Sequence, residues 1–161
     1  MSKLISIIVN CYNGEKYLKQ TLESIQKQSY TNWELIFWDN KSTDNSKAIF
    51  DSFNESRFKY FYSEKFTSLY EARNLACRKC NGEFIAFLDC DDLWMPSKLE
   101  KQLCILEANK NIALVHSNTI FFNSDNGYER VYHKSKRTSG YIFNEVVCDY
   151  YFSLETKSKT F

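Results

Sequence analysis

Short apolar runs alternate with helix-like patterns over about the first 110 residues of this chain. Strands are predicted at residues 4–9, 34–38, 58–62 and 84–88, and the segments between them repeat apolar residues every three or four positions. This alternation is typical of βα units, in which helices cover a largely parallel sheet. The sequence therefore predicts an α/β fold with one mostly parallel sheet flanked by helices.

Several helices have recognisable starts. We expect Asn13 to cap a first helix, and Ser68 and Glu71 to form a capping box for a later one. Pro96 is predicted to start a further helix. Beyond it, strands are predicted at 112–116, 119–122 and 128–132, with a hairpin turn at 125–127. We place a core domain at 1–123 and a hairpin with the start of an incomplete region at 124–161.

Length and composition narrow the class of protein. A chain of 161 residues with 43% apolar residues can bury one core, and its net charge of +1 argues against nucleic-acid binding. The N-terminal run is too short and polar for a signal peptide, and no stretch has the ~20 apolar residues of a membrane span. We therefore expect a cytoplasmic protein, and a peripheral position at the inner face of the membrane is compatible with this.

Cysteine and histidine offer weaker signals. Cys77 and Cys80 have the spacing of half a zinc site or of a redox pair, but the sequence has no second CxxC. We interpret them as free thiols that act as small apolar side chains. His116 lies in a predicted strand, and we expect an ordinary packed histidine.

Three acids follow the predicted strand at 84–88. Asp89, Asp91 and Asp92 are crowded together, and like charges at the end of a buried strand cost energy unless a cation or hydrogen-bond donors compensate. Carboxylates are hard ligands that suit Mg²⁺ or Mn²⁺, and these ions complete their shells with water and phosphate oxygens. The acid cluster therefore predicts a divalent metal and a ligand that carries phosphate.

Two other polar clusters follow predicted strands. Asn10, Tyr12 and Asn13 follow the first strand, and Asp39 and Asn40 follow the second. Ligands of open α/β sheets bind at these carboxyl ends. Tyr12 is suited to stacking on a base, and Asp39 and Asn40 to hydrogen bonds with a base or ribose. We therefore expect a nucleotide site.

One basic residue belongs to the same hypothesis. Arg73 lies in the helix predicted after Ser68. Its guanidinium is expected either to reach a phosphate or to pair with the acid cluster, and the alternative is an exposed helix residue.

Four ordered motifs resemble those of family 2 glycosyltransferases. They are SIIVNCYN at 6–13, WDNKSTD at 38–44, ARN at 72–74 and FLDCDD at 87–92, followed by Trp94 and Pro96. The resemblance implies a GT-A fold and inverting sugar transfer from a nucleotide diphosphate sugar, with a UDP sugar favoured. It also implies a glycan or lipid-linked acceptor of cell-surface polysaccharide synthesis. By resemblance, Tyr12 and Asp39 line the nucleobase pocket, Asp89 contacts the ribose, and Asp91 or Asp92 holds the metal.

The chain departs from the family pattern at three positions near the site. Proline is common at position 10, a second acid at 40 and glycine at 41, where this chain has Asn10, Asn40 and Lys41. Lys41 is strained if that position takes a positive φ.

The catalytic base is not recognisable. The acids after residue 110 match no general-base pattern: Asp125, Glu129, Glu145, Asp149 and Glu155. We therefore expect the donor-binding half of a glycosyltransferase, shortened after the donor site, with weak or absent transfer.

Three other classes of protein make different demands on the sequence. A receiver-like signalling domain needs acids after the first strand and a lysine after the fifth, which this chain lacks. A dinucleotide-dependent oxidoreductase needs a G-x-G-x-x-G after the first strand, which is also missing. A non-catalytic nucleotide-sugar-binding module predicts the same pocket and stays open as the alternative.

Overall fold

A parallel sheet of four strands forms the centre of the computed structural model, which describes residues 2–122, 129–131 and 158–160. The strands are β1 (Ile5–Cys11), β2 (Trp33–Asp39), β3 (Phe58–Tyr62) and β4 (Phe84–Asp89), in the order β3-β2-β1-β4. Every residue of β1 and β2 is buried. All four strands were predicted, with ends that differ by at most two residues, because each contains a short run rich in apolar residues. The continuous burial of β1 and β2 is typical of central parallel strands.

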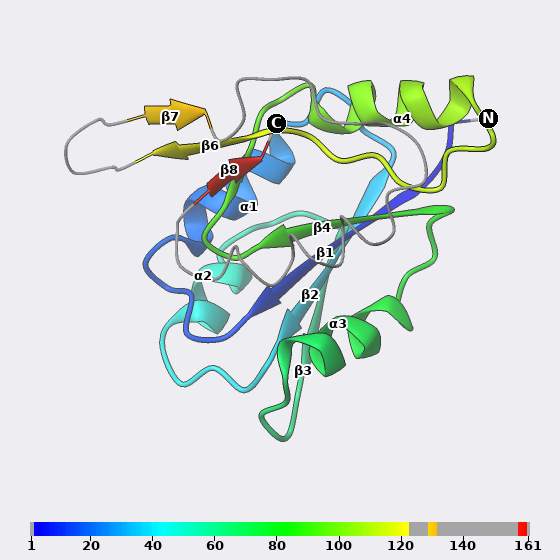
Figure 1. Cartoon of the computed structure of the whole chain (residues 1–161). Coiled ribbons are helices and arrows are strands. Elements are labelled where there is room, and N and C mark those ends of the chain that lie inside the picture. Colours follow the sequence, from blue (N-terminus) through cyan, green and yellow to red (C-terminus); the bar gives the residue numbers. More distant parts are fainter. Residues whose placement is uncertain (1, 123–128, 132–157, 161) are drawn as a thin grey trace.

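Helices cover both faces of this sheet (Figure 1). Helices α1 (Leu18–Gln26) and α2 (Ser46–Asp51) lie on one face, and α3 (Leu69–Cys77) lies on the other. Helix α4 (Lys98–Ala108) follows β5 (Leu93–Trp94). Helix α1 forms where predicted because its apolar stripe at residues 18, 22 and 25 is fully buried.

The two helix-cap predictions have different outcomes. The Ser68 side chain accepts a hydrogen bond from the Glu71 backbone N–H at the start of α3, as predicted. Asn13 does not cap α1, so this prediction is wrong. The residue before α1 is Tyr17, whereas Asn13 has a φ of 53° and bonds to another loop.

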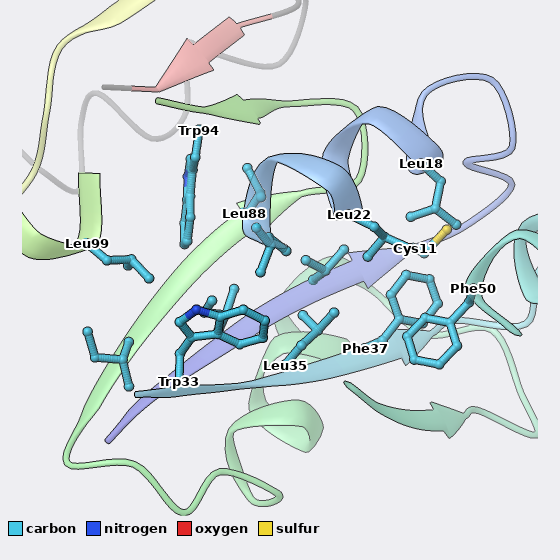
Figure 2. Close-up of a cluster of buried hydrophobic side chains, with 14 of the residues drawn as sticks. Cys11, Leu18, Leu22, Trp33, Leu35, Phe37, Phe50, Leu88, Trp94 and Leu99 are labelled. Carbon is cyan, nitrogen blue, oxygen red and sulfur yellow. The ribbon is translucent and has the colours of Figure 1, made fainter. Parts of the chain in front are cut away.

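The larger core lies between the sheet and α1 and α2 (Figure 2). Leu22 of α1 belongs to the same cluster as Leu35 and Leu88, and the Phe37 ring packs against Phe50 with centroids 4.8 Å apart. A smaller cluster under α3 contains Ile8, Ile36, Trp38, Ala72 and Ala76. Cys77 and Cys80 are free thiols that pack against this smaller cluster, which confirms their interpretation as small apolar side chains.

Strand β4 has only one buried face, which corrects the expectation of a buried strand. Leu88 is 3% exposed, whereas Ile85 and Phe87 are each 45% exposed. Phe87 lies opposite Ile8, so the exposed face is the one that α3 covers farther along the sheet. β4 is an edge strand of this sheet, and Arg73 of α3 reaches this face of it, with its guanidinium over the Phe87 ring.

A second sheet has the strand order β5-β8-β6-β7. Strands β6 (Thr119–Phe122) and β7 (Glu129–Val131) are antiparallel, which confirms the two hairpin strands; the predicted turn at 125–127 lies outside the described residues. Strand β8 (Ser158–Thr160) pairs with both β5 and β6. The predicted boundary at residue 123 stays a prediction, and this sheet combines strands from both sides of it.

The strand predicted at 112–116 does not form. Residues 112–118 have no regular secondary structure, and Leu114 is 56% exposed. In the part of the chain that the structure describes, no strand pairs with this segment, so its apolar run has no ladder to join. His116 is exposed, and the expectation of a packed histidine is therefore wrong.

Candidate functional site

The parallel register brings the predicted polar clusters to one edge of the sheet. Asn10 of β1 lies opposite Asp89 of β4. Cys11 of β1 lies opposite Asp39 of β2. We call the ends of β1, β2 and β4 with their following loops, residues 10–17, 39–46 and 89–92, the carboxyl edge. The sequence predicted this meeting because parallel strands end on the same side of a sheet.

Arg73 pairs with the acid cluster, which was one of its two predicted roles. Its Nη2 lies 2.6 Å from Asp89 Oδ1, and its guanidinium lies over the Phe87 ring, 5.6 Å from the centroid. The Arg73 side chain is 13% exposed, whereas that of Asp89 is 51% exposed. The ion pair therefore leaves much of the Asp89 carboxylate open to a ligand and fixes its orientation.

The two predicted metal ligands have different surroundings. Asp91 is exposed, whereas Asp92 is 8% exposed in a turn where its backbone N–H donates to Asp89 O. Lys98 is also buried, and its Nζ donates to Ser117 Oγ at 2.8 Å. Burial lowers the pKa of Lys98 to about 8, and the charge of Asp92 opposes this shift. Asp91 therefore faces solvent, and Asp92 acts inside the protein on Lys98, a residue that sequence reasoning missed.

Asn13 joins two loops of the carboxyl edge. Its backbone N–H donates to Ser42 Oγ at 3.0 Å, and its Oδ1 accepts from the Thr43 backbone N–H at 2.8 Å. Beside it, the Glu15 backbone N–H donates to Asp44 Oδ2 at 2.9 Å. Asparagine tolerates the positive φ found here. Asn13 thus fixes the loop after β1 to the loop after β2.

Asp39 is buried beneath the second loop. It is 1% exposed, and its Oδ1 accepts from the Ser42 backbone N–H at 2.7 Å. Its Oδ2 accepts from the Tyr60 hydroxyl, and burial together with this carboxylate raises the pKa of Tyr60. Tyr60 was missed, although the alternation of residues 58, 60 and 62 along β3 is the signal that places it on one face.

Asn40 is also buried and committed to protein contacts. Its Oδ1 accepts from Thr67 N and Oγ1, at 3.2 and 2.9 Å, and its Nδ2 donates to Thr67 O at 2.8 Å. Its backbone N–H donates to Cys11 O. These hydrogen bonds fix the β3–α3 loop to the end of β2. Its contact with a base edge stays a prediction.

Asn10 and Tyr12 offer groups to a ligand. Asn10 is 9% exposed, and its Nδ2 finds no hydrogen-bond partner in the described structure. A buried donor without a partner is costly, and a bound ligand would relieve that cost. Tyr12 is 51% exposed, and its ring contacts that of Phe66, which sequence reasoning also missed.

Two thiols pack under the loop after β1. A hydrogen bond between them lowers the pKa of Cys11 and raises that of Cys90. A Cβ on Gly14 would lie 2.8 Å from Cys11 Sγ and 3.1 Å from Cys90 Sγ. Glycine at this position therefore lets the loop lie directly against the acid motif.

The donor set suits a metal shared with a phosphate ligand. Within residues 2–122, 129–131 and 158–160, no group of three or more His, Cys, Asp or Glu side chains is placed to hold an ion. Mg²⁺ and Mn²⁺ are commonly bound by one or two carboxylates, with phosphates and water completing the shell. Asp91, which is exposed and lies two residues after Asp89 in the sequence, fits this mode.

The family model for glycosyl transferase family 2 matches residues 6–155. The chain belongs to this family. This family 2 chain is 38% identical over 122 residues to the Escherichia coli UDP-Glc:alpha-D-GlcNAc-diphosphoundecaprenol beta-1,3-glucosyltransferase WfgD. The match covers 76% of this chain and 48% of WfgD, so the chain spans about half the length of that relative.

Solved structures place this family 2 chain in the GT-A fold. S. aureus TarS 1-349, solved in complex with UDP-GlcNAc, is 28% identical with a TM-score of 0.63, over 71% of this chain and 32% of TarS. A mannosyltransferase from Pyrobaculum calidifontis, solved with GDP-Man and Mn²⁺, has the same fold at 21% identity and a TM-score of 0.62. That match covers 76% of this chain and 36% of the mannosyltransferase. None of the described helices is long and apolar enough to cross a membrane.

Proposed function

We propose that this chain is the donor-binding half of a metal-dependent, inverting glycosyltransferase of cell-surface glycan synthesis. The observation that carries the proposal is the placement of Asn10 beside Asp89, at the same edge as the exposed Asp91 and Tyr12. The name of WfgD and the UDP-GlcNAc complex of TarS support a UDP sugar as the donor. The acceptor is a hydroxyl of a glycan or of a lipid-linked sugar.

Exposure, together with hydrogen bonds to other parts of the protein, divides these predicted site residues into two groups. Tyr12, Asp89 and Asp91 are exposed, and we assign them to the base, the ribose and the metal. The second group fixes the loops that present the first: Asn13, Asp39, Asn40, Arg73 and Asp92, of which all but Asn13 and Arg73 are buried. Direct metal ligation by Asp92 stays a prediction.

Charge on the leaving group explains why acids are needed at this edge. Transfer breaks the bond between the anomeric carbon and the diphosphate oxygen and forms a bond from that carbon to the acceptor oxygen, whose proton passes to a general base. A bound Mn²⁺ or Mg²⁺ would stabilise the charge that develops on the diphosphate. The exposed carboxylate of Asp91 would hold this ion, and Arg73 would keep Asp89 in place beside it.

The catalytic base is not assigned to any described residue. Of the acids after residue 110, Glu129 lies in β7, and the others, Asp125, Glu145, Asp149 and Glu155, lie outside the described residues. The test of the proposal therefore begins with donor binding.

Calorimetry with UDP, GDP and dTDP, each with and without Mn²⁺, tests the site. We expect one nucleotide to bind more tightly with Mn²⁺. Asp91→Ala should remove this metal-dependent gain, whereas Glu107→Ala, which removes an exposed acid of α4, should keep it. Failure of all three nucleotides to bind the wild-type chain would overturn the proposal, and so would an unchanged Mn²⁺ effect in Asp91→Ala.

A further inference from the structure

Two exposed aromatic rings meet beside the carboxyl edge. Tyr12 follows β1 and is 51% exposed, and Phe66 lies in the β3–α3 loop and is 60% exposed. Their ring centroids are 4.7 Å apart, and their planes make an angle of 60°. Leaving two large rings in water forgoes the free energy of burying them, so their position beside a ligand site points to a ligand that covers them.

The loop that carries Phe66 is fixed on both sides of it. On one side, the buried Ser63 donates its backbone N–H to Asp39 O at 2.9 Å. On the other side, the buried Thr67 makes three hydrogen bonds with the side chain of Asn40. Both anchors belong to the end of β2. Phe66 is therefore held at the carboxyl edge before any ligand arrives, which lowers the ordering cost of binding.

Resting on the proposed function, we propose that Phe66 is the second aromatic surface of the nucleobase subsite. The angle between the rings makes a corner in which a planar base stacks on one ring and meets the edge of the other. Every base has a π-face, so such stacking adds affinity for any nucleotide. Phe66 therefore sets how tightly the nucleotide binds, and polar groups of the carboxyl edge set which base is accepted.

The chemistry of the two rings favours a nucleobase over the other parts of the donor. A diphosphate needs cations and hydrogen-bond donors, which these rings do not supply. The rings lie at the ends of β1 and β3, whereas Asp91, the residue assigned to the metal, follows β4. The base and the diphosphate are thus received at different strands of one edge.

Calorimetry of UDP with Mn²⁺ on three Phe66 variants tests this inference. Phe66→Ala should weaken UDP binding about tenfold, as expected for the loss of one stacked base. Phe66→Trp should retain binding because it keeps a ring, and Phe66→Leu should recover only part of it. Ile105→Ala on α4 is the control, because it removes a comparably exposed apolar side chain, 46% exposed, outside the carboxyl edge.

Pyrophosphate with Mn²⁺ separates the base from the diphosphate. Phe66→Ala should leave pyrophosphate binding unchanged, because the ring is assigned to the base alone. Equal losses for UDP and pyrophosphate would overturn the inference, as would wild-type UDP affinity in Phe66→Ala. If the wild-type chain binds pyrophosphate but no nucleotide, or neither, the proposed function itself fails and the inference falls with it.

Discussion

At the scale of single residues, Lys41 carries strain in the loop after β2. Its φ is 72°, and a non-glycine residue in this region costs about 1–2 kcal/mol relative to a right-handed conformation. The side chain is exposed, so nothing in the core depends on it. We predict that Lys41→Gly raises the free energy of unfolding by about 0.5–1 kcal/mol, after subtracting the greater freedom of glycine in the unfolded chain. Urea denaturation of the two proteins measures this difference.

A matched lysine outside this loop separates the relief of backbone strain from the general effect of replacing lysine by glycine. Lys101 is exposed on α4 in an ordinary helical position, and Lys101→Gly should lower the free energy of unfolding by about 1 kcal/mol. Opposite signs for the two variants are the expected result. A lower free energy of unfolding in Lys41→Gly would show that the lysine stabilises the folded loop by more than its backbone strain destabilises it.

At the scale of elements, Glu34 of β2 connects β1, β3 and the segment before β4. Its carboxylate accepts from Ser6 Oγ of β1 at 2.7 Å, from Lys59 Nζ of β3 at 2.6 Å and from the Asn81 backbone N–H at 2.7 Å. Burial alone would raise the pKa of Glu34, but these donors outweigh it and lower the pKa to about 2, from a usual value of 4.5.

This shift predicts a loss of stability in acid. Because the folded pKa lies below the unfolded one, the contribution of Glu34 is complete above about pH 4.5 and disappears as the pH falls toward 2. Its size is about 3 kcal/mol. Urea denaturation at pH 7, 4 and 3 should therefore show a steep decline in the wild type and a flatter one in Glu34→Gln. Glu23→Gln on the surface of α1 should keep the wild-type slope, and equal slopes in all three would contradict the assignment.

Strands and helix caps differ in how well the sequence predicts them. The four strands of the main sheet were predicted because their apolar runs are local, and the Ser68 cap because its partner lies three residues away. The predicted cap at Asn13 does not form. The Asn13 side chain instead accepts a hydrogen bond from the backbone N–H of Thr43, 30 residues away. The strand at 112–116 failed because an apolar run needs a neighbour to pair with.

The candidate site was predicted in outline for a similar reason. Parallel strands end at one edge, so the motifs were expected to meet there. Two details of the site depend on the elements that pack around it. One is which face of β4 is buried, and the other is that Asp91 is exposed whereas Asp92 is buried. Phe66 was missed because its position is set by Asn40 and Thr67, and nothing in its neighbouring residues signals that contact.

At the scale of the whole molecule, the candidate site joins the loops after β1, β2 and β4, so a ligand bound there must be released when the sheet unfolds. A ligand at a hundredfold excess over its dissociation constant stabilises the folded state by about 2.7 kcal/mol. For a chain of this length, we expect the unfolding midpoint to rise by roughly 5–10 °C when the preferred nucleotide and Mn²⁺ are added together. Differential scanning calorimetry measures this rise.

Asp91→Ala should lose the part of this rise that depends on Mn²⁺ and retain the part due to the nucleotide alone, because the base and the metal are assigned to different residues of one edge. If the unfolding midpoint of Asp91→Ala rises as much as that of the wild type, the metal must be assigned to another carboxylate. If Mn²⁺ alone raises the midpoint as much as Mn²⁺ with the nucleotide, the ion binds without the nucleotide.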